Sequence, residues 1–413
     1  MLYWIVILLV VWGWVCVGNV MYFIIRWYLY GRQLKLESHK TADRVAVIAS
    51  VKEADKDFFQ NVTVLINQDH PCFRVIYCLS DTQDSAFQSL VAFFKLDTRA
   101  TVPAYHITKQ RLSELHQGSF GLQSVDIVVA GRAEICSQKI FNQIRAYYLL
   151  SPEDCVVAWV DADICLSASW LNDLIYPIRK KTHAATTGYR CLVPAGKDWS
   201  SAIISVINSS ILTLLGDPWR NSLWGGSMAM TRQVFEKFSI PEYVKQCFTD
   251  DESVGALLKK NNIPIYCSFT LLPPGKTKYT FREMFGFGRR QYMCARFYYK
   301  FHLFIACLLL SGFTLVFFFL LAKLFVQPGR FDLLLFTGLL GAMVLRGSIR
   351  FYFIRYKLGM PGYSLKCLFL ETLGTPLVHL LHLMICYAAM VGHTVEWAGI
   401  TYKIKGPFHV KVI

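Results

Sequence analysis

Two carboxylates one residue apart end an apolar segment near the middle of the chain. Val156–Val160 is hydrophobic, and Asp161 and Asp163 follow it. Side chains two residues apart on a strand point the same way, so this pair can face one cation. Carboxylate oxygens are hard ligands of the kind that Mg²⁺ and Mn²⁺ prefer. The spacing therefore predicts a divalent-metal site, with two aspartates in an ordinary surface loop as the alternative.

Other short apolar runs also end in polar residues or glycine that could bind a ligand. Runs rich in β-branched residues occupy residues 45–51, 73–80, 125–131 and 155–163, with helix-length segments between them. This alternation predicts an α/β domain with a largely parallel sheet that helices cover on both faces. Ligands of such sheets bind beyond the carboxyl ends of the strands. The residues at those ends are Ser50, Lys52, Asp81, Gly131, Asp161 and Asp163.

The composition is typical of a membrane protein. Hydrophobic residues make up 54% of the 413 residues, charged residues make up 17%, and the mean hydropathy is +0.36. Residues 1–25 carry no charge, and about 20 such residues span a bilayer core. A cleaved signal peptide is the alternative, but a basic amino-terminal region and a short apolar core are both missing. We expect a retained transmembrane anchor.

Three more apolar segments follow the soluble region. Leu303–Ala322 is long enough to span a membrane. Leu333–Leu345 is short and would require Arg346 and Arg350 to snorkel toward the interface. The last segment, Thr372–Val391, is interrupted by a Gly-Thr-Pro sequence. The predicted order is thus anchor, soluble domain and membrane helices.

Positive charge follows the apolar segments. Lys and Arg gather at residues 26–35, 289–300 and 346–357, beside the first, second and third segments. By the positive-inside rule, these clusters predict a cytosolic soluble domain. The net charge of +15 therefore indicates membrane orientation and attraction to phosphates or anionic lipids, not nucleic-acid binding. The 13 cysteines include no CxxC pair, so we expect neither a zinc site nor a disulfide framework.

An ordered series of motifs between residues 44 and 300 resembles a known family. The motifs are VAVIASVK, YCLSDTQD, AGRAEICSQKIFNQ, WVDADI, WGGSMAM, FTDDES and GRRQYMCARFY. In this order they are similar to the membrane-bound processive-type and ceramide glucosyltransferase-like glycosyltransferases of families 2 and 21. The resemblance implies a GT-A fold for this region and flanking membrane helices, as the apolar segments also indicate.

The resemblance assigns a donor role to several residues. The residue matching Asp81 binds the uridine of the donor in the family, and a carboxylate can accept from the uracil imide N–H. A turn-forming aspartate is the alternative. Lys139 matches the lysine of a QKxxN segment and would lie near the diphosphate; a solvated helical lysine is the alternative. By resemblance, Asp163 is a direct ligand of Mg²⁺ or Mn²⁺, and Asp161 lies near the ribose and a metal-bound water. Further predicted donor contacts are Ser50, Lys52 and Gly131.

On the acceptor side, the resemblance points to two segments. Asp251 aligns best with the general base of the family, and Asp250 is the next candidate. Adjacent carboxylates raise one another's pKa, which suits a base. An acidic first helical turn is a structural role that is compatible with this one. Trp224, Gly225 and Gly226 match an acceptor-side segment, with a tight turn packed by a core Trp as the alternative.

The last motif departs from the family pattern. Many members carry Q/R-x-x-R-W on an interfacial helix, whereas this chain has Arg290 and Gln291 followed later by Arg296 and Phe297. We therefore expect Arg290 and Gln291 to contact the donor diphosphate, and Arg296 with less support. Aromatic and basic residues alternate here, as in an amphipathic interface helix.

These features predict five parts and an activity. The parts are an anchor (1–27), a GT-A domain (40–280), an interface helix (281–300), transmembrane or interfacial helices (301–395) and a tail (396–413). The tail resembles a W-x-G-x-x-Y sequence that the family keeps in the cytosol, so we expect one carboxyl-terminal segment not to span. Three full crossings with an external tail are the alternative.

The expected activity is inverting transfer of a hexose from a nucleotide sugar, UDP-hexose, to a membrane lipid hydroxyl such as that of ceramide, at the cytosolic leaflet. A processive polysaccharide synthase and a non-catalytic membrane scaffold with a GT-A domain are the alternatives. His379, His382 and Glu371 do not match a zinc pattern, so we expect them to make polar contacts within the bundle.

Overall fold

The computed structural model describes residues 2–36, 43–97, 104–218 and 220–413. The chain divides into two compact units, each built from three separate parts of the sequence. We call these the sheet unit (residues 30–190, 216–273 and 393–413) and the helical unit (residues 1–29, 191–215 and 274–392). The predicted GT-A domain, 40–280, thus contributes residues 191–215 and 274–280 to the helical unit, and residues 40–42 lie outside the described part.

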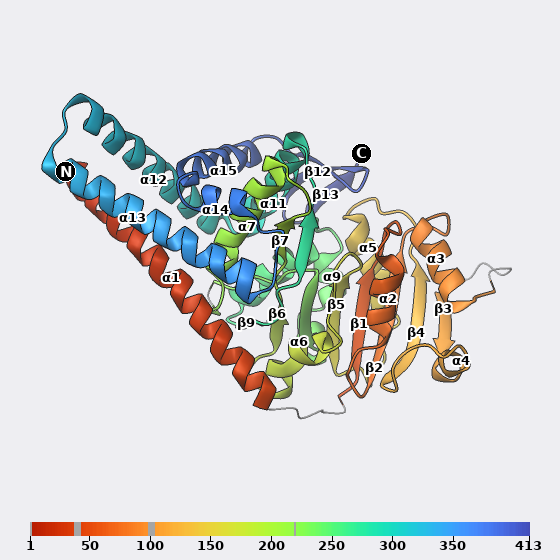
Figure 1. Cartoon of the computed structure of the whole chain (residues 1–413). Coiled ribbons are helices and arrows are strands. Elements are labelled where there is room, and N and C mark those ends of the chain that lie inside the picture. The colour runs from red at the N-terminus through yellow and green to blue at the C-terminus, as the bar shows by residue number, and fades with distance from the viewer. Residues whose placement is uncertain (1, 37–42, 98–103, 219) are drawn as a thin grey trace. The chain divides into compact units, whose positions relative to one another are not determined.

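An eight-stranded sheet forms the centre of the sheet unit (Figure 1). Its strands are β1 (Val45–Ser50), β2 (Phe73–Leu79), β3 (Ala104–Thr108), β4 (Leu122–Val129), β5 (Val156–Asp161), β6 (Ala185–Thr187), β8 (Ser227–Thr231) and β9 (Ile265–Cys267). The order is β3-β4-β2-β1-β5-β8-β6-β9. Among these described strands, β3 and β8 run antiparallel to the other six. The predicted α/β class, with a mixed, mostly parallel sheet and a helix bundle, is confirmed, and the assignment of the sheet to the GT-A type stays a prediction.

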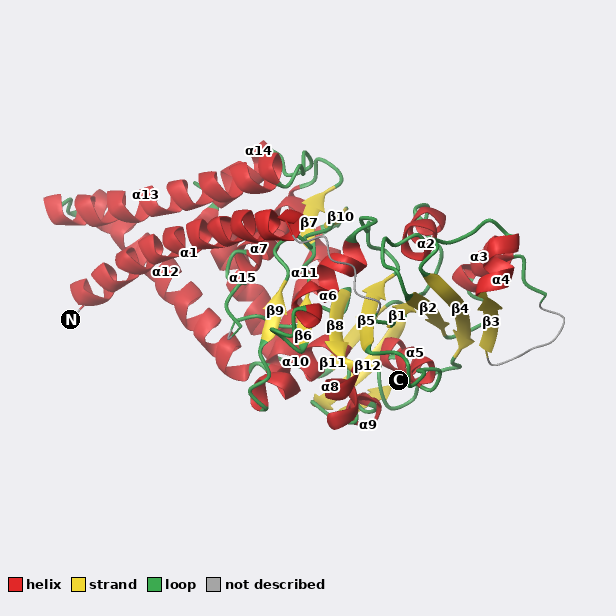
Figure 2. Cartoon of the chain, turned by 90° about the horizontal axis from the view of Figure 1, so that it is seen from below, coloured by secondary structure: helices red, strands yellow, loops and turns green. Residues whose placement is uncertain are grey.

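Helices cover both faces of this sheet, which explains why its strands are hydrophobic throughout. The helices are α2 (Phe58–Ile66), α3 (Ser85–Phe94), α4 (Lys109–Glu114), α5 (Gln138–Tyr147), α6 (Trp170–Arg179), α8 (Arg232–Lys237), α9 (Ile240–Val244) and α10 (Asp250–Lys260). In β1, Val45 and Val47 pack into a core shared with α2, α3 and α6, whereas Ile48 packs into a core shared with α5, α8 and α10. Figure 2 shows α2 and α3 on one side of the strands and α5 and α8 on the other.

The carboxyl-terminal tail folds as a small antiparallel sheet within the sheet unit. Its strands are β11 (Thr394–Trp397), β12 (Ile400–Gly406) and β13 (His409–Val412). Ala398 and Gly399 connect the first two strands with φ values of +51° and +72°, as a two-residue type I′ turn requires. The backbone N–H of Val412 donates to the carbonyl of Glu134 at 3.0 Å. The tail is therefore a folded part of this unit. Its buried side chains are Val395, Tyr402, Ile404 and Val410.

The helical unit contains the long apolar helices. Its elements are α1 (Leu2–Leu36, in this unit up to Leu29), β7 (Cys191–Pro194), α7 (Trp199–Leu212), β10 (Pro274–Thr277), α11 (Phe281–Tyr298), α12 (Lys300–Val326), α13 (Arg330–Tyr352), the π-helix η1 (Phe353–Lys357), α14 (Leu365–Glu371) and α15 (Thr375–Met390). Among the described residues, three segments are long and apolar enough to cross a membrane: Tyr3–Arg32, Lys300–Val326 and Arg330–Lys357.

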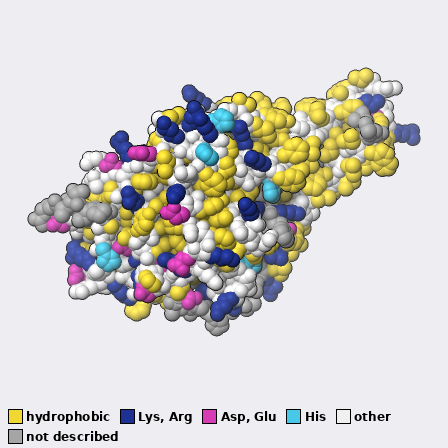
Figure 3. All heavy atoms as spheres, turned by 180° about the vertical axis from the view of Figure 1, so that it is seen from behind, with side chains coloured by type: hydrophobic (Ala, Val, Ile, Leu, Met, Phe, Trp, Pro, Cys, Tyr) yellow, Lys and Arg dark blue, Asp and Glu magenta, His cyan; other side chains and the backbone are white. Residues whose placement is uncertain are grey.

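Three of these helices pack together along apolar faces. Val6 of α1, Phe313 of α12 and Leu339 of α13 belong to one buried cluster. Helix α1 lies close to α13 at Gly13, where an added Cβ would lie in van der Waals contact with Ala342, at 3.4 Å. Hydrophobic side chains dominate the exposed surface of the long helices in Figure 3. Such a surface suits a lipid environment.

The short third apolar segment is the centre of a longer helix. Helix α13 spans 23 residues and extends beyond Leu333–Leu345 at both ends. The expectation that Arg350 snorkels toward the interface is wrong, because this side chain is buried and paired with Glu371. The apolar run understated the span because polar residues continue the helix inside the unit.

The last apolar segment is broken. Helices α14 and α15 meet at an angle of 81°, as in a broken span or a re-entrant loop. The break lies at Thr372–Gly374, so it overlaps the predicted Gly-Thr-Pro interruption only at Gly374, and Thr375 and Pro376 already belong to α15. Gly347 of α13 faces it, since an added Cβ there would lie 2.2 Å from the carbonyl oxygen of Glu371. The non-spanning segment and the cytosolic tail stay predictions. The bent pair α14–α15 is a candidate for the segment that does not span.

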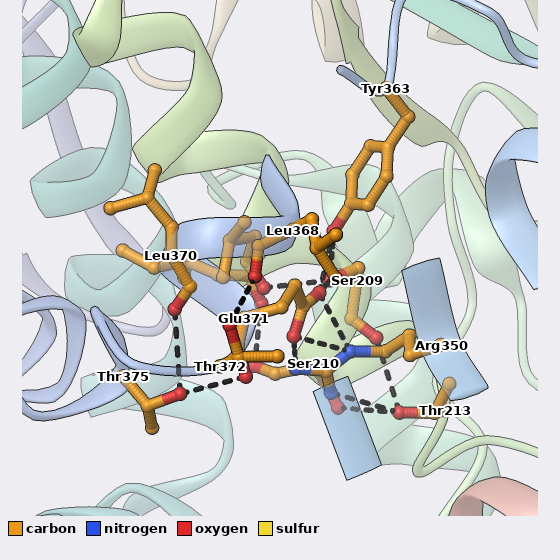
Figure 4. Close-up of polar contacts among 12 residues, drawn as sticks. Ser209, Ser210, Thr213, Arg350, Tyr363, Leu368, Leu370, Glu371, Thr372 and Thr375 are labelled. Atoms are coloured by element: carbon orange, nitrogen blue, oxygen red, sulfur yellow. Dashed lines mark hydrogen bonds and ion pairs between the residues drawn. The ribbon is translucent and has the colours of Figure 1, made fainter. Parts of the chain in front are cut away.

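A closed polar cluster supports this bend (Figure 4). The Nε of Arg350 donates to both carboxylate oxygens of Glu371, at 2.8 and 2.9 Å. Ser209 and Tyr363 donate their hydroxyls to the same carboxylate, at 2.7 and 2.5 Å. The Nη1 of Arg350 donates to Thr213 at 3.4 Å. This cluster ties α7 and α13 to the end of α14, so Glu371 makes polar contacts within the bundle, as expected.

Candidate functional site

The site of the sheet unit begins at the end of its central strand. Asp161 is the last residue of β5 and stands beside Ser50 of β1 in the parallel register. Its backbone N–H donates to the carbonyl of Gly226 at 3.3 Å. The strand register therefore brings together three segments that the sequence singled out separately.

Lys139 connects two of the predicted carboxylates. Helix α5 starts after Ser137, whose Oγ accepts from the N–H of Ile140, and this start places Lys139 on the first turn. Its Nζ lies 2.9 Å from Asp161 Oδ1 and 3.2 Å from Asp250 Oδ2. Burial alone would lower the pKa of Lys139, but the neighbouring aspartates hold this pKa above its usual range. Lys139 is thus a fixed positive charge and not a solvated helical lysine.

Asp250 is held in place by two donors. It is 3% exposed, and besides Lys139 it accepts from Gln143 Nε2 at 2.6 Å. Sequence reasoning missed Gln143. The available signal was its position four residues after Lys139, which places both side chains on the same face of a helix.

Asp251 accepts two backbone hydrogen bonds and has a raised pKa. Its Oδ2 accepts from the N–H of Gly225 at 2.9 Å and its Oδ1 from the N–H of Glu252 at 2.7 Å. Burial, followed by repulsion from Asp250, raises the pKa of Asp251 to about 6. This value suits a general base that operates near neutral pH. The pKa of Glu252 is also raised well above its usual range, by burial and by Asp251.

Gly225 and Gly226 are needed because neighbouring side chains approach their backbone closely. A Cβ on Gly225 would lie 2.8 Å from the Nζ of Lys139 and 3.0 Å from Asp250 Oδ1. A Cβ on Gly226 would lie 2.3 Å from the ring of Trp224. Both positions therefore need a residue without a side chain. The tight-turn interpretation also holds, since the same segment leads directly into β8.

The second aspartate of the DxD pair has a different partner. Asp163 accepts from Arg190 Nη2 at 2.6 Å, and its side chain is 58% exposed. The Arg190 guanidinium lies over the ring of Trp224, 5.7 Å from the ring centroid, and the N–H of Trp224 donates to Thr187 at 2.9 Å. Sequence reasoning missed Arg190, which no spacing in the sequence connects to Asp163.

The remaining strand-end residues lie along the same edge. Asp81 Oδ1 accepts from the N–H of Gln83 at 2.9 Å, so the turn-forming role is present. Gly131 has a φ of +85°, and an added Cβ would meet nothing within 4 Å. Ser50 Oγ lies 3.4 Å from the sulfur of Cys78, and Lys52 donates to the carbonyl of Ala398.

The predicted diphosphate contacts Arg290, Gln291 and Arg296 belong to the other unit, on α11. Arg296 Nη1 donates to the carbonyl of Gly392 at 3.0 Å, just beyond the end of α15. The guanidinium of Arg290 lies over the ring of Phe287, 5.4 Å from its centroid, and Gln291 is exposed. Within the helical unit, Arg296 thus binds carbonyls at a helix end, and a donor role for the three stays a prediction.

The charges of the sheet-unit site are unequal. Four carboxylates, those of Asp161, Asp163, Asp250 and Asp251, stand beside two cationic side chains, Lys139 and Arg190. In the described residues no three His, Cys, Asp or Glu side chains are close enough to hold a metal together. Two carboxylates are nevertheless enough for Mg²⁺ or Mn²⁺ when substrate phosphates supply the other ligands. Asp161 and Asp163 fit that use.

Comparison with known proteins finds likenesses among solved structures but none among sequences. No protein-family model and no curated protein sequence matches the chain. A solved mannosyltransferase from Pyrobaculum calidifontis, in complex with GDP-mannose and Mn²⁺, is 11% identical, with coverage of 94% of this chain and 98% of that one. The TM-score is 0.42. A likeness this loose does not specify an activity or a substrate.

Proposed function

We propose that this protein is a glycosyltransferase that transfers a hexose, with inversion, from UDP-hexose to the hydroxyl of a membrane lipid. A ceramide-like lipid is the proposed acceptor, on the ground of the motif resemblance. The protein would be a multi-pass membrane protein whose sheet unit lies in the cytosol. The three long apolar helices and the positions of the basic clusters support this placement.

One observation carries the proposal: the arrangement of Lys139, Asp161, Asp250 and Asp251 at the carboxyl edge of the sheet. Nucleotides bind at this edge in open α/β domains. Asp250 is occupied by Lys139 and Gln143. Asp251 has a pKa near 6, so it can both gain and lose a proton at neutral pH.

These residues have distinct parts in the proposed reaction. Asp251 accepts the proton of the acceptor hydroxyl as the hydroxyl oxygen forms a bond to the anomeric carbon. The bond between that carbon and the donor's diphosphate breaks on the opposite side, and the nucleoside diphosphate leaves with the electron pair. The positive charge of Lys139 favours the negative charge that develops on the leaving group. Attack from the face opposite the leaving group inverts the anomeric centre.

Mg²⁺ or Mn²⁺ is the proposed cofactor, held by Asp163 and Asp161 together with donor phosphates. A bound divalent cation neutralises charge on a departing diphosphate. The excess of carboxylates over cationic side chains in the site supports this assignment. Arg190 pairs with Asp163, and its guanidinium would have to share or release that carboxylate when a cation binds.

The test is transfer from a panel of labelled nucleotide sugars. Membranes containing the protein are incubated with each UDP- or GDP-sugar, and the extracted lipids are analysed by mass spectrometry. We expect one glycolipid, and at least about a hundredfold less of it from membranes with the Asp251→Asn variant. Labelled polymer in place of glycolipid would identify a polysaccharide synthase. The absence of both transfer and sugar hydrolysis would favour a non-catalytic scaffold.

A further inference from the structure

The carboxyl-terminal sheet contacts three segments that each lead into the candidate site. These segments are the end of β1, the start of α5 and the residues that precede α10. They are far apart in the sequence, but each lies within two residues of a proposed donor or acceptor contact. Residues 393–413 and all three segments belong to the sheet unit.

The first contact is made by the turn of the β11–β12 hairpin. Lys52, two residues beyond β1, donates its Nζ to the carbonyl of Ala398. Ala398 and Gly399 are exposed at the tip of the hairpin. Since β1 lies next to β5 in the sheet, the tip stands at the edge on which a nucleotide would lie.

The second contact is at the start of α5. The N–H of Gln138 donates to the hydroxyl of Tyr402 at 3.2 Å, and Tyr402 is 1% exposed. Gln138 itself holds the loop before the helix, since its Nε2 donates to the carbonyl of Gly131 at 2.8 Å. The tail thus supports both Gly131 and the turn that presents Lys139.

The third contact is aromatic. The ring of Phe248, two residues before Asp250, meets the rings of Trp397 and Tyr402 edge to face, at centroid distances of 5.6 and 5.2 Å. Trp397 is half-buried and directly precedes the hairpin tip. An indole in this position can stack on a nucleobase or cover it.

We propose that the β11–β12 hairpin, with Trp397 and the Ala398–Gly399 tip, forms a wall of the donor site and retains the nucleoside diphosphate part of the donor. This inference rests on the proposed function and adds a positioning element to it. The tail orients Lys52 through the Ala398 carbonyl and gives the nucleotide an aromatic surface through Trp397. It takes no part in proton transfer, so it governs donor affinity and not the chemical step.

The experiment measures UDP binding to the full chain in detergent, by calorimetry, and donor kinetics in the same preparation. Trp397→Ala is expected to weaken UDP binding about tenfold, as the loss of a stacking ring does, and to raise the donor KM with kcat unchanged. Phe408→Ala is the matched control. Phe408 is another partly exposed tail aromatic, whose ring meets Tyr243 edge to face at 5.2 Å, and this variant should bind UDP within about twofold of the wild type.

A second measurement does not depend on removing a side chain. In a variant with Cys155 and Cys165, the exposed cysteines of the described residues, replaced by serine, Ala398→Cys is labelled with a maleimide. UDP is expected to slow the labelling at least fivefold, whereas Lys411→Cys should react at the same rate with and without UDP.

Three outcomes separate the two proposals. UDP binding by the wild type with equal affinity in Trp397→Ala, or with no protection of the thiol introduced by Ala398→Cys, would overturn the wall and leave the proposed function intact. Equal weakening by Phe408→Ala would also overturn it, since the tail would then act through the fold alone. A wild type that binds no nucleoside diphosphate would overturn the proposed function together with the wall.

Discussion

Each of the two units contains a cluster of charged side chains, and the clusters differ in how far their carboxylates are paired with cationic side chains. In the helical unit, the Glu371 carboxylate accepts from Arg350, Ser209 and Tyr363. The hydrogen-bonded charges there are one guanidinium and one carboxylate, with Arg346 of α13 beside them. In the sheet unit, four carboxylates share Lys139 and Arg190, and Asp163 is more than half exposed.

This difference separates a structural role from a chemical one. A matched buried pair has every strong acceptor satisfied, so its contribution is to hold helices in one arrangement. An unmatched set of carboxylates is unfavourable without a further cation, and sites that perform acid–base chemistry keep such unfavourable groups. The first cluster should therefore govern stability and the second should govern activity, and each experiment below tests that division.

Removal of divalent metal should have the largest effect on activity. EDTA is expected to reduce sugar transfer to background, and Mg²⁺ or Mn²⁺ should restore it, because the unmatched carboxylates need a cation to hold the donor phosphates. Asp163→Asn should lose the response to metal, whereas Glu371→Gln should retain it. Full activity in EDTA would remove the metal from the proposal.

Asp251→Asn should lower kcat by about 10²–10⁴-fold, the usual contribution of a general base. Donor binding should change little, since a base acts in the transition state. The melting temperature should stay the same or rise, because the fold no longer holds a carboxylate whose ionised form is disfavoured. A variant with wild-type kcat would transfer the role of base to Asp250.

Glu371→Ala should have the opposite profile. Removal of one partner of a buried pair lowers the free energy of unfolding by about 3–5 kcal/mol, as measured by thermal denaturation in detergent. The double variant Arg350→Met with Glu371→Leu should recover most of this loss, because neither member of the pair is left buried without the other. Unchanged stability in the single variant would show that the cluster does not hold the bundle.

Gly225→Ala should damage the sheet-unit site by crowding. The added methyl group would meet the Nζ of Lys139 at 2.8 Å, and overpacking of this kind costs about 1–3 kcal/mol. We expect reduced stability together with reduced kcat. Gly286→Ala is the control, since its Cβ meets nothing within 4 Å in a helix, where alanine is favoured over glycine by up to about 1 kcal/mol.

The pH profile gives the smallest expected effect. With a pKa of about 6 for Asp251, kcat/KM should fall about tenfold for each pH unit below 6, because the protonated base cannot accept a proton. A raised carboxyl pKa also means that acidification from pH 6 toward the pKa of an unfolded aspartate stabilises this site. Asp251→Asn should abolish the acidic limb of the rate profile. Persistence of that limb would assign it to another group.

Local sequence patterns predicted the sheet and the carboxylates because these depend on residues close in the chain. The β-branched runs formed strands, and Asp161 ended one of them. The partners of the carboxylates depend on distant residues instead. Gln143 and Asp250 are 107 residues apart in the sequence, and Arg190 and Asp163 are 27 residues apart. No periodic pattern in the sequence therefore predicts either pair.

The unit boundaries and the fold of the tail could not be predicted from the sequence for a related reason. The strands of the tail are short, and their burial depends on contacts such as Tyr402 with Gln138, 264 residues away. Arg350 was predicted to snorkel toward the membrane interface, because this is the usual behaviour of an arginine in an apolar segment. Its partner Glu371 lies in another helix, and only the packing of α13 against α14 brings the two together.

The path of the chain has a consequence for the order of synthesis. The chain passes between the units at residues 29/30, 190/191, 215/216, 273/274 and 392/393. A ribosome therefore makes every long apolar helix before it makes β11, β12 and β13. The contacts of Lys52, Gln138 and Phe248 with these strands can therefore form only after all of the long apolar helices have been made. A nascent chain stalled among its apolar helices would lack those contacts, so the edge of the sheet that carries Lys139 and Asp161 is completed only after the last of these helices has been made.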